Sequence, residues 1–375
     1  MQKITSIADA QVEGKRVLLR TSLNVPIRAD GTVGDLFRLR AALPTIEWLS
    51  RHGASTCVLA HLGRDGASLK PVVEILASLT TVPIQFFGGS LAEARAHPIA
   101  PGSCVVLENI RIHPEEEDND QQFANALAQL GDLYVDDAFA DAHRPHASIV
   151  SVPKLLPSYA GLLMLKEIER ITPAVTPPSQ SLAIIGGAKF ETKEPLIAQL
   201  LTRYERVLLG GALANDLLKT RGLPIGSSRT SAIPIPVAIA ENEQLVAPKD
   251  AVLVDDALHR HRCAGINDVR IAERIVDIGP ETAGLWESCI TQAAFVVWNG
   301  PMGIYEDGFV DGTDALAEAL SRANVPAVVG GGDTLAALQK IAFDPEKIFL
   351  STGGGALLEF LTTGTLAGIE ALRRV

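Results

Sequence analysis

Basic and polar side chains follow the short apolar runs in the first half of the chain, at 16–23, 55–62, 103–110 and 133–139. The set comprises Arg20, Asn24, Arg38, His61, Arg64, Arg111, His143 and Arg144. Each arginine alone is typical of a protein surface, but several meeting at one end of a sheet would be costly without an anion. Guanidinium groups match carboxylate and phosphate oxygens bidentately. The first half is therefore predicted to bind a small, multiply anionic molecule.

Glycines occupy the corresponding positions of the second half, after its own apolar runs. They are Gly186, Gly187, Gly210, Gly211, Gly300, Gly330, Gly331, Gly332, Gly353, Gly354 and Gly355. The first N–H groups of a helix have no partner within it, and the helix dipole favours negative charge there. A bare backbone would let a phosphate reach these groups. For any single glycine, close packing of a helix on a sheet is the alternative interpretation.

Two lysines and one aspartate accompany these glycines. Lys189 and Lys193 are four residues apart in the segment 186–193 and would share a helix face if that segment is helical. Asp333 follows three glycines, either as the N-cap of the next helix or as a Mg²⁺ ligand. Together these residues suit a nucleotide polyphosphate with Mg²⁺. The sequence contains no G-x-x-x-x-G-K-S/T, and no G-x-G-x-x-G follows the first apolar run. These absences exclude a P-loop enzyme and a standard dinucleotide fold.

Charge and composition narrow the class of protein. The net charge of −11 disfavours a surface that binds duplex nucleic acid, and no run of about 18 apolar residues is present to span a membrane. The four cysteines are Cys57, Cys104, Cys263 and Cys289. They lack C-x-x-C spacing and indicate reduced residues of a cytosolic protein. The segment 1–16 has no apolar core of a secretory signal, and the acidic run 115–118 predicts the start of a solvated helix.

The elements that must position these residues alternate along the chain. Each short β-branched run precedes a longer helical pattern. The runs of the second half are 182–187, 206–211, 251–256, 295–300, 327–332 and 348–352. Strands that alternate with helices indicate βαβ units, and near-continuous apolar runs indicate parallel strands covered on both faces. The predicted fold class is α/β, with two Rossmann-like, three-layer αβα domains and mostly parallel sheets.

A proline-rich boundary separates the two halves. Residues 171–181 contain three prolines and several small polar residues, which is typical of a linker. The preceding segment, 159–171, has the spacing of a connecting hinge helix. Ligands of parallel sheets bind beyond the carboxyl ends of the strands. An anion site on one domain and a nucleotide site on the other suit phosphoryl transfer, with domain closure expelling water.

An ordered set of motifs resembles the phosphoglycerate kinase family over nearly the whole chain. In the first half these are "NVPI" at 24–27, "RLRAALPTI" at 38–46, "AHLGR" at 60–64, "LENIR" at 107–111 and "DAFADAHRPHAS" at 137–148. In the second half they are "GGAKFETK" at 186–193, "DIGPET" at 277–282, "VVWNGPMGIYE" at 296–306, "GGGDT" at 330–334 and "STGGGA" at 351–356. Single pieces are weak signals, but their order is specific, above all "WNGPMG" with "STGGGA".

The resemblance implies reversible phosphoryl transfer between ATP and 3-phosphoglycerate, giving ADP and 1,3-bisphosphoglycerate, as in glycolysis and gluconeogenesis. It implies a 3-phosphoglycerate-binding domain at 1–170 that includes the connecting helix, and a Mg-nucleotide-binding domain at 171–358. The segment 359–375 is expected to pack back on the first domain. Mg²⁺ would enter with ATP or ADP, and the protein is expected to be a cytoplasmic monomer without nucleic-acid or membrane partners.

The same resemblance assigns roles to residues. Substrate binding would fall to Ser22, Asn24, Arg38, His61, Arg64, Arg111 and Arg144. Nucleotide binding would fall to Lys193, Gly210, Gly211, Asn299, Glu306, Gly332, Asp333, Thr334 and Gly353, with Asp333 as the Mg²⁺ site. The transferring phosphoryl group would meet Arg38, Lys189, Gly354 and Gly355.

Two sites in the first half depart from the family pattern. Ser22 stands where the usual "RVDFNVP" has Asp, and Ala140 and Asp141 replace the usual Gly-Thr. An extra carboxylate near an anion site is unfavourable unless it pairs with an arginine or points away. These departures leave open an alternative, a paralogue of the same fold with an altered acid substrate or reduced activity. A nicotinamide-dependent dehydrogenase is a third hypothesis, which the missing glycine-rich fingerprint disfavours.

Overall fold

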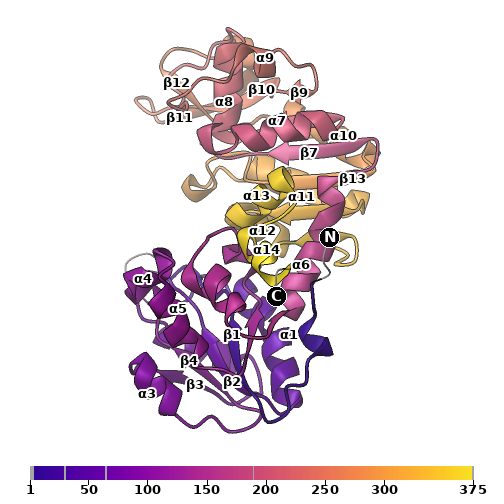
Figure 1. Cartoon of the computed structure of the whole chain (residues 1–375). Coiled ribbons are helices and arrows are strands. Elements are labelled where there is room, and N and C mark those ends of the chain that lie inside the picture. The colour runs from indigo at the N-terminus through magenta and orange to yellow at the C-terminus, as the bar shows by residue number, and fades with distance from the viewer. Residues whose placement is uncertain (1–3, 29–30, 64–65, 189, 374–375) are drawn as a thin grey trace. The chain divides into compact units, whose positions relative to one another are not determined.

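The chain forms two compact units (Figure 1). The computed structural model describes residues 4–28, 31–63, 66–188 and 190–373. Unit 1 comprises Met1–Glu169 with Thr365–Val375, and unit 2 comprises Arg170–Gly364. Two predicted site residues, Arg64 and Lys189, lie outside the described residues. Over the described ranges, no helix is long and apolar enough to cross a membrane.

Unit 1 is built on a parallel sheet of six strands in the order β3-β4-β2-β1-β5-β6. The strands are β1 (Arg16–Arg20), β2 (Ser55–Leu59), β3 (Ile84–Phe87), β4 (Cys104–Leu107), β5 (Leu133–Asp136) and β6 (Ser158–Ala160). Successive side chains of a strand point to opposite faces of its sheet. Accordingly, Val17 and Leu19 join one hydrophobic cluster, and Leu18 joins another. Both faces of the sheet are therefore covered.

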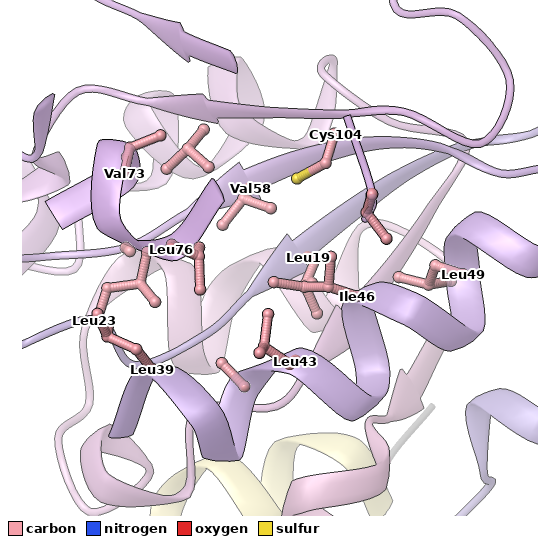
Figure 2. Close-up of a cluster of buried hydrophobic side chains, with 14 of the residues drawn as sticks. Leu19, Leu23, Leu39, Leu43, Ile46, Leu49, Val58, Val73, Leu76 and Cys104 are labelled. Atoms are coloured by element: carbon pink, nitrogen blue, oxygen red, sulfur yellow. The ribbon is translucent and has the colours of Figure 1, made fainter. Parts of the chain in front are cut away.

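Helices cover the two faces of this sheet. On one face lie α1 (Phe37–Arg51) and α2 (Lys70–Ser78), and on the other lies α5 (Gln121–Ala128). Figure 2 shows Leu19 and Val58 of the strands gathered with Ile46 and Leu76 of the helices. On the opposite face Phe123 packs in the cluster of Leu18. This arrangement is the predicted three-layer αβα sandwich.

Short helices complete unit 1. They are α3 (Leu91–Ala96), α4 (Pro114–Glu117), a π-helical turn at Ala147–Ser151 and α14 (Ala367–Arg373), with 3₁₀ turns at Ile7–Asp9, Ile110–Ile112, Phe139–Asp141 and Val152–Lys154. The C-terminal helix α14 packs closely inside this unit. The N–H of Gly368 donates to the carbonyl of Ala142 at 2.8 Å, and a Cβ at 368 would lie 3.0 Å from Ile149 Cγ2. Glycine therefore permits the close approach of this helix.

Unit 2 contains a second parallel sheet, in the order β15-β14-β13-β7-β8-β9. Its strands are β7 (Ser181–Ile185), β8 (Arg206–Leu209), β9 (Leu245–Val246), β13 (Phe295–Asn299), β14 (Ala327–Gly330) and β15 (Ile348–Leu350). The helices of this unit are α7 (Glu194–Arg203), α8 (Gly211–Thr220), α9 (Val237–Ala240), α10 (Pro280–Gln292), α11 (Asp311–Ala323), α12 (Gly332–Gln339) and α13 (Gly355–Thr363). The predicted fold class, α/β with mostly parallel sheets, is confirmed.

A small antiparallel sheet in unit 2 departs from the βαβ pattern. Its strands are β10 (Asp250–Asp255), β11 (Arg260–Gly265) and β12 (Glu273–Ile278), in the order β11-β10-β12. The predicted run 251–256 is therefore a strand, but it lies outside the parallel sheet. Only residues 256–259 join β10 to β11. So short a connection makes a hairpin, because a parallel crossover needs a dozen or more residues.

The connecting helix α6 (Leu162–Val175) runs further than the sequence predicts. At its start, Asp137 Oδ1 accepts the N–H groups of Leu163 at 2.9 Å and Met164 at 3.1 Å. Near its end, Ala174 is buried and its carbonyl accepts from the Tyr204 hydroxyl at 2.7 Å. This packing holds the last turn despite Pro173, so the first residues of the predicted linker 171–181 are helical.

Candidate functional site

Basic side chains gather where the strands of unit 1 end. In the sheet order β4-β2-β1-β5, Arg111 follows β4, His61 follows β2, Arg20 ends β1 and Arg144 follows β5. Neighbouring parallel strands end at one edge of a sheet, so residues distant in sequence come together there. All four residues act electrostatically on the carboxylate of Asp141. We refer to Arg20, His61, Arg111 and Arg144 as the basic cluster.

Arg20 is the buried centre of the basic cluster, with 1% of its surface exposed. Its Nε donates to Ser148 Oγ at 3.0 Å, one Nη to the Thr21 carbonyl at 2.5 Å, and the other Nη to His61 Nδ1 at 3.2 Å. A guanidinium can only donate, so the imidazole accepts at Nδ1. Burial lowers the pKa of His61 to about 3, which leaves the ring neutral near pH 7. The neutral ring therefore carries its proton on Nε2 and can donate there.

The loops beyond the strands are tied to one another by predicted site residues. One Arg38 Nη donates to the Asn24 carbonyl at 2.6 Å, and Asn24 Oδ1 accepts the N–H of Gly63 at 2.9 Å. The carbonyl of Gly63 accepts from Arg111 at 3.1 Å. The loops after β1, β2 and β4 are thus linked, and the structure brings Asn24, Arg38 and Arg111 to one end of unit 1.

The two positions that depart from the family pattern lie among these residues. Ser22 is buried, and its Oγ has no hydrogen-bond partner within the described part of the chain. Asp141 is 4% exposed, and its Oδ2 lies 3.3 Å from an Arg20 Nη and 3.5 Å from His61 Nδ1. Asp141 therefore faces an arginine rather than pointing away from the cluster.

Two residues that sequence reasoning missed hold Arg20 in place. Glu116 is fully buried, and its carboxylate accepts from the Ser148 Oγ at 2.6 Å and from the Ser148 N–H at 2.9 Å. Ser148 in turn accepts from Arg20. The prediction of a solvated helix for 115–118 is wrong at Glu116, because this helix, α4, turns that side chain inward beside the π-helical turn. No local sequence signal distinguishes Glu116 from its acidic neighbours.

Lys193 ties together two strand ends in unit 2. Its Nζ donates to the Gly186 carbonyl after β7 at 2.7 Å, and to Asn299 Oδ1 at the end of β13 at 3.0 Å. Burial lowers the pKa of Lys193 to about 8. The segment before it forms a 3₁₀ turn at Phe190–Thr192, and Lys193 is the N-cap of α7. An ammonium group therefore sits at the edge where β7 and β13 end.

Polar atoms without partners lie at the same edge. Asn299 Nδ2 and Thr334 Oγ1 are buried and make no hydrogen bond to any described residue. Both lie beside Gly331, because a Cβ there would be 3.5 Å from Asn299 Nδ2 and 3.6 Å from Thr334 Oγ1. The structure thus brings the predicted residues Asn299 and Thr334 together, with hydrogen-bonding capacity to spare for a ligand.

The presence of glycine at the strand ends has different physical explanations at different positions. A Cβ at Gly186 would collide with the Pro301 carbonyl, so glycine there serves close packing. Gly354 differs, because a Cβ would meet nothing within 4 Å and its φ of −66° suits any residue. Gly354 is the N-cap of α13 and makes no side-chain cap. Neither close packing nor a left-handed φ explains the bare backbone at this helix start.

A cavity of about 240 Å³ opens at this edge of unit 2. Its lining residues include Gly187, Gly211, Asn215, Arg229, Met302, Ile304, Glu306 and Asp333. Gly210, the N-cap of α8, borders Met302, since a Cβ at 210 would lie 3.0 Å from Met302 Cε. Asn215, Arg229, Met302 and Ile304 were missed as site residues. Only the last two fall in a quoted motif, and nothing in the sequence singles out the other two.

Asp333 lines the cavity but does not cap a helix. The N-cap of α12 is Gly331, with φ of +102°, and Gly332 opens the helix, so the N-cap interpretation is wrong. Burial, with a smaller contribution from Glu306, raises the pKa of the Asp333 carboxyl. Among the described residues no group of three or more His, Cys, Asp or Glu side chains could hold a metal. A single carboxylate that lines the cavity nevertheless fits Mg²⁺ that is carried by phosphate oxygens, because Mg²⁺ usually takes one or two protein carboxylates.

The fold and these sites define a class of protein. One α/β unit presents a basic cluster at its strand ends, and the other presents an ammonium group, glycine-rich helix starts and a cavity. These features are typical of a two-domain α/β protein that binds an anionic ligand and a phosphate-bearing one. The family model for phosphoglycerate kinase matches residues 7–364, and the chain belongs to that family.

Individual relatives agree with the family over the whole length. The chain is 41% identical to a phosphoglycerate kinase of Moorella thermoacetica over 392 residues, covering 99% of both chains. It is 39% identical to one of Roseiflexus sp. (strain RS-1), covering 98% of both. Among solved structures, the phosphoglycerate kinase from Coxiella burnetii matches with a TM-score of 0.82 and 33% identity, covering 99% of both chains. The one from Pyrococcus horikoshii matches with a TM-score of 0.87 and 27% identity, covering 98% of both.

Proposed function

We propose that this protein catalyses reversible phosphoryl transfer between ATP and 3-phospho-D-glycerate, giving ADP and 1,3-bisphosphoglycerate. One observation carries the proposal: this chain, a member of the family, has two candidate binding sites, the basic cluster in unit 1 and the site around Lys193 in unit 2. A binding protein for one ligand would need only one of them. Transfer between two ligands needs both.

Unit 1 would hold the acid substrate. Its ligands would be Ser22, Asn24, Arg38, His61, Arg64, Arg111 and Arg144. The Nε2–H of His61 is buried and has no acceptor in the described structure. A neutral donor of this kind suits a carboxylate or phosphate oxygen, and adjacent guanidinium groups supply the charge. These two properties support the proposal that unit 1 binds a multiply anionic acid.

Unit 2 would hold the nucleotide. Its ligands would be Lys193, Gly210, Gly211, Asn299, Glu306, Gly332, Asp333, Thr334 and Gly353. The cavity would take the nucleoside, with Glu306 in reach of the ribose hydroxyls. When bound with the nucleotide, Mg²⁺ would neutralise phosphate charge, and Asp333 would hold it.

The chemistry asks for charge neutralisation rather than proton transfer. A carboxylate oxygen of the acid attacks the γ-phosphorus, and that carboxylate is already ionised near pH 7, so no general base is required. The transferring group carries negative charge on its equatorial oxygens, and positioning and electrostatics lower the barrier. Arg38, Lys189 and the N–H groups of Gly354 and Gly355 would serve this purpose, the last two at the start of α13.

The domain and cellular assignments extend the same proposal. We propose that the functional halves follow the two compact units, Met1–Glu169 with Thr365–Val375 and Arg170–Gly364, and that the halves close before in-line transfer. We also propose that the protein acts as a monomer in the cytoplasm. In the part of the chain that the structure describes, all four cysteines are unpaired, which suits a reducing compartment.

A coupled assay tests the proposal directly. The purified protein with ATP, Mg²⁺ and 3-phosphoglycerate should form ADP at a rate that saturates in both substrates. Other small phosphorylated acids, tested at equal concentration, should support much slower turnover. A folded protein that prefers another acid would point to the paralogue with an altered substrate. A folded protein that transfers phosphate to none of them would contradict the proposal.

A further inference from the structure

Asp141 is a carboxylate placed inside a site that is built to attract anions. It lies in the 3₁₀ turn Phe139–Asp141, which follows β5, and only 4% of it is exposed. Its Oδ2 faces both Arg20 and His61, at 3.3 Å and 3.5 Å. Arg111 and Arg144 also act on its charge. Every member of the basic cluster therefore interacts electrostatically with this carboxylate.

The carboxylate stays ionised in this environment. Burial favours the neutral acid, but the surrounding cluster outweighs burial and lowers the pKa of Asp141 to about 2. His61 contributes most to this lowering, and Arg20 follows, whose guanidinium lies 3.3 Å from Oδ2 and is charged at physiological pH. A full negative charge therefore resides in the cluster at physiological pH.

Asp141 does not act as a hydrogen-bonding support for Arg20. Arg20 already donates to the Ser148 Oγ, the Thr21 carbonyl and His61 Nδ1. Asp141 Oδ2 makes no hydrogen bond to any residue that the structure describes. What it contributes to Arg20 is charge, acting over a distance slightly longer than a hydrogen bond.

We propose that Asp141 is a specificity-determining residue, a resident counter-charge that weakens the hold of the basic cluster on anions and so speeds their release. This inference rests on the proposed acid-binding role of unit 1. An anion bound to the cluster would lie in the field of Asp141, and the repulsion grows with the number of charges that the anion carries. The site would thus discriminate among ligands by charge as well as by shape.

The chain offers a matched control for this effect. Glu117 Oε1 lies 3.2 Å from Arg111 Nε, so it also pairs with a member of the basic cluster. Its side chain is 55% exposed, whereas that of Asp141 is 6% exposed. Solvent screens an exposed carboxylate much more than a buried one. The two carboxylates therefore separate the effect of buried charge from the mere loss of an acidic group.

Calorimetric titration of the full chain without nucleotide tests the inference. The probes are 3-phosphoglycerate and inorganic phosphate, the first carrying more negative charge. Asp141→Asn should lower the dissociation constant for 3-phosphoglycerate by about threefold to tenfold and that for inorganic phosphate by less. Glu117→Gln should change either constant by less than about twofold. The KM for ATP should stay as in the natural protein, because the change lies in unit 1.

The outcomes distinguish this inference from the proposed function. If the natural protein binds 3-phosphoglycerate and Asp141→Asn binds it equally well or more weakly, the counter-charge role is wrong. If the natural protein binds neither probe, the acid-binding role of unit 1 fails, and the inference with it. Should Asp141→Asn not fold, Asp141→Thr, the residue of the family pattern, provides the same test with the same expected tightening.

Discussion

We expect Lys193 to lower the free energy of unfolding of the protein and to be required for nucleotide binding. Burial lowers its pKa from 10.5 to about 8, which corresponds to about 3 kcal/mol of destabilisation when the group is charged near pH 7. Lys193→Met removes that charge and keeps an apolar stem. It also leaves Gly186 O and Asn299 Oδ1 without their donor, which costs about 1 kcal/mol each. We therefore expect Lys193→Met to unfold with a free energy about 1 kcal/mol higher than the natural protein at pH 7.

The pH dependence gives this prediction its sign. Between the folded and unfolded pKa values, the unfolded chain binds more protons at Lys193 than the folded one, so stability rises with pH. The destabilisation is complete below about pH 8 and disappears as the pH approaches about 10.5. The stability advantage of Lys193→Met over the natural protein should therefore shrink from pH 7.5 to about pH 10.

Urea unfolding at several pH values, with calorimetric titration of Mg-ADP, provides the assay. The natural protein should bind Mg-ADP at least about tenfold more tightly than Lys193→Met, because the variant lacks the ammonium group at the strand ends. Lys219→Met, on an exposed part of α8, is the control and should alter neither property. A Lys193→Met protein that is less stable at every pH, yet binds Mg-ADP normally, would refute the reasoning.

Three further substitutions test other parts of the site. Gly354→Ala should leave the free energy of unfolding unchanged or raise it by about 0.5 kcal/mol, because φ is −66° and a Cβ meets nothing within 4 Å. The same substitution should lower kcat by about tenfold or more, and an unchanged kcat would remove the start of α13 from the mechanism. Asp333→Asn should keep the free energy of unfolding within about 0.5 kcal/mol of the natural protein's, since Gly331 is the N-cap. A titration of activity with Mg²⁺ should show that the variant needs a much higher Mg²⁺ concentration than the natural protein. An unchanged Mg²⁺ requirement would exclude the metal role. Arg38→Ala should lower kcat by about a hundredfold or more with little change in Mg-ADP affinity, and steady-state kinetics showing near-normal turnover would count against its role in transfer.

The parallel sheets were predictable because their strands are short, nearly continuous apolar runs in the sequence. β1, β2 and β5 are buried on both faces, so each is a short, nearly continuous apolar run, and its length and β-branched residues identify it as a strand. The run of β10 has the same local character, but its antiparallel partners are set by the short connection at 256–259 and by β12. Local pattern identifies a strand in each case, whereas its partner depends on the rest of the chain.

The sequence indicated several residues of the candidate site, but it did not indicate the network of contacts that joins them. Sequence position places Arg20, His61 and Asp141 after strands that end at one edge. Which of them pair depends on tertiary packing, since Arg20 and Asp141 are far apart in the chain yet 3.3 Å apart in the fold. Glu116 shows the same limit, because its burial depends on Ser148 in another segment. Asp333 was expected as a cap or a ligand, and a positive φ at Gly331 decided against the cap.

Trapping the acyl phosphate tests the central claim most directly. The full chain is incubated with ATP, Mg²⁺ and 3-phosphoglycerate in the presence of hydroxylamine, which converts an acyl phosphate to a hydroxamate, and both ADP and hydroxamate are measured. The account predicts equal amounts of the two products, and neither product when 3-phosphoglycerate is omitted. ADP released without hydroxamate would show hydrolysis instead of transfer to the carboxylate, and would contradict the account.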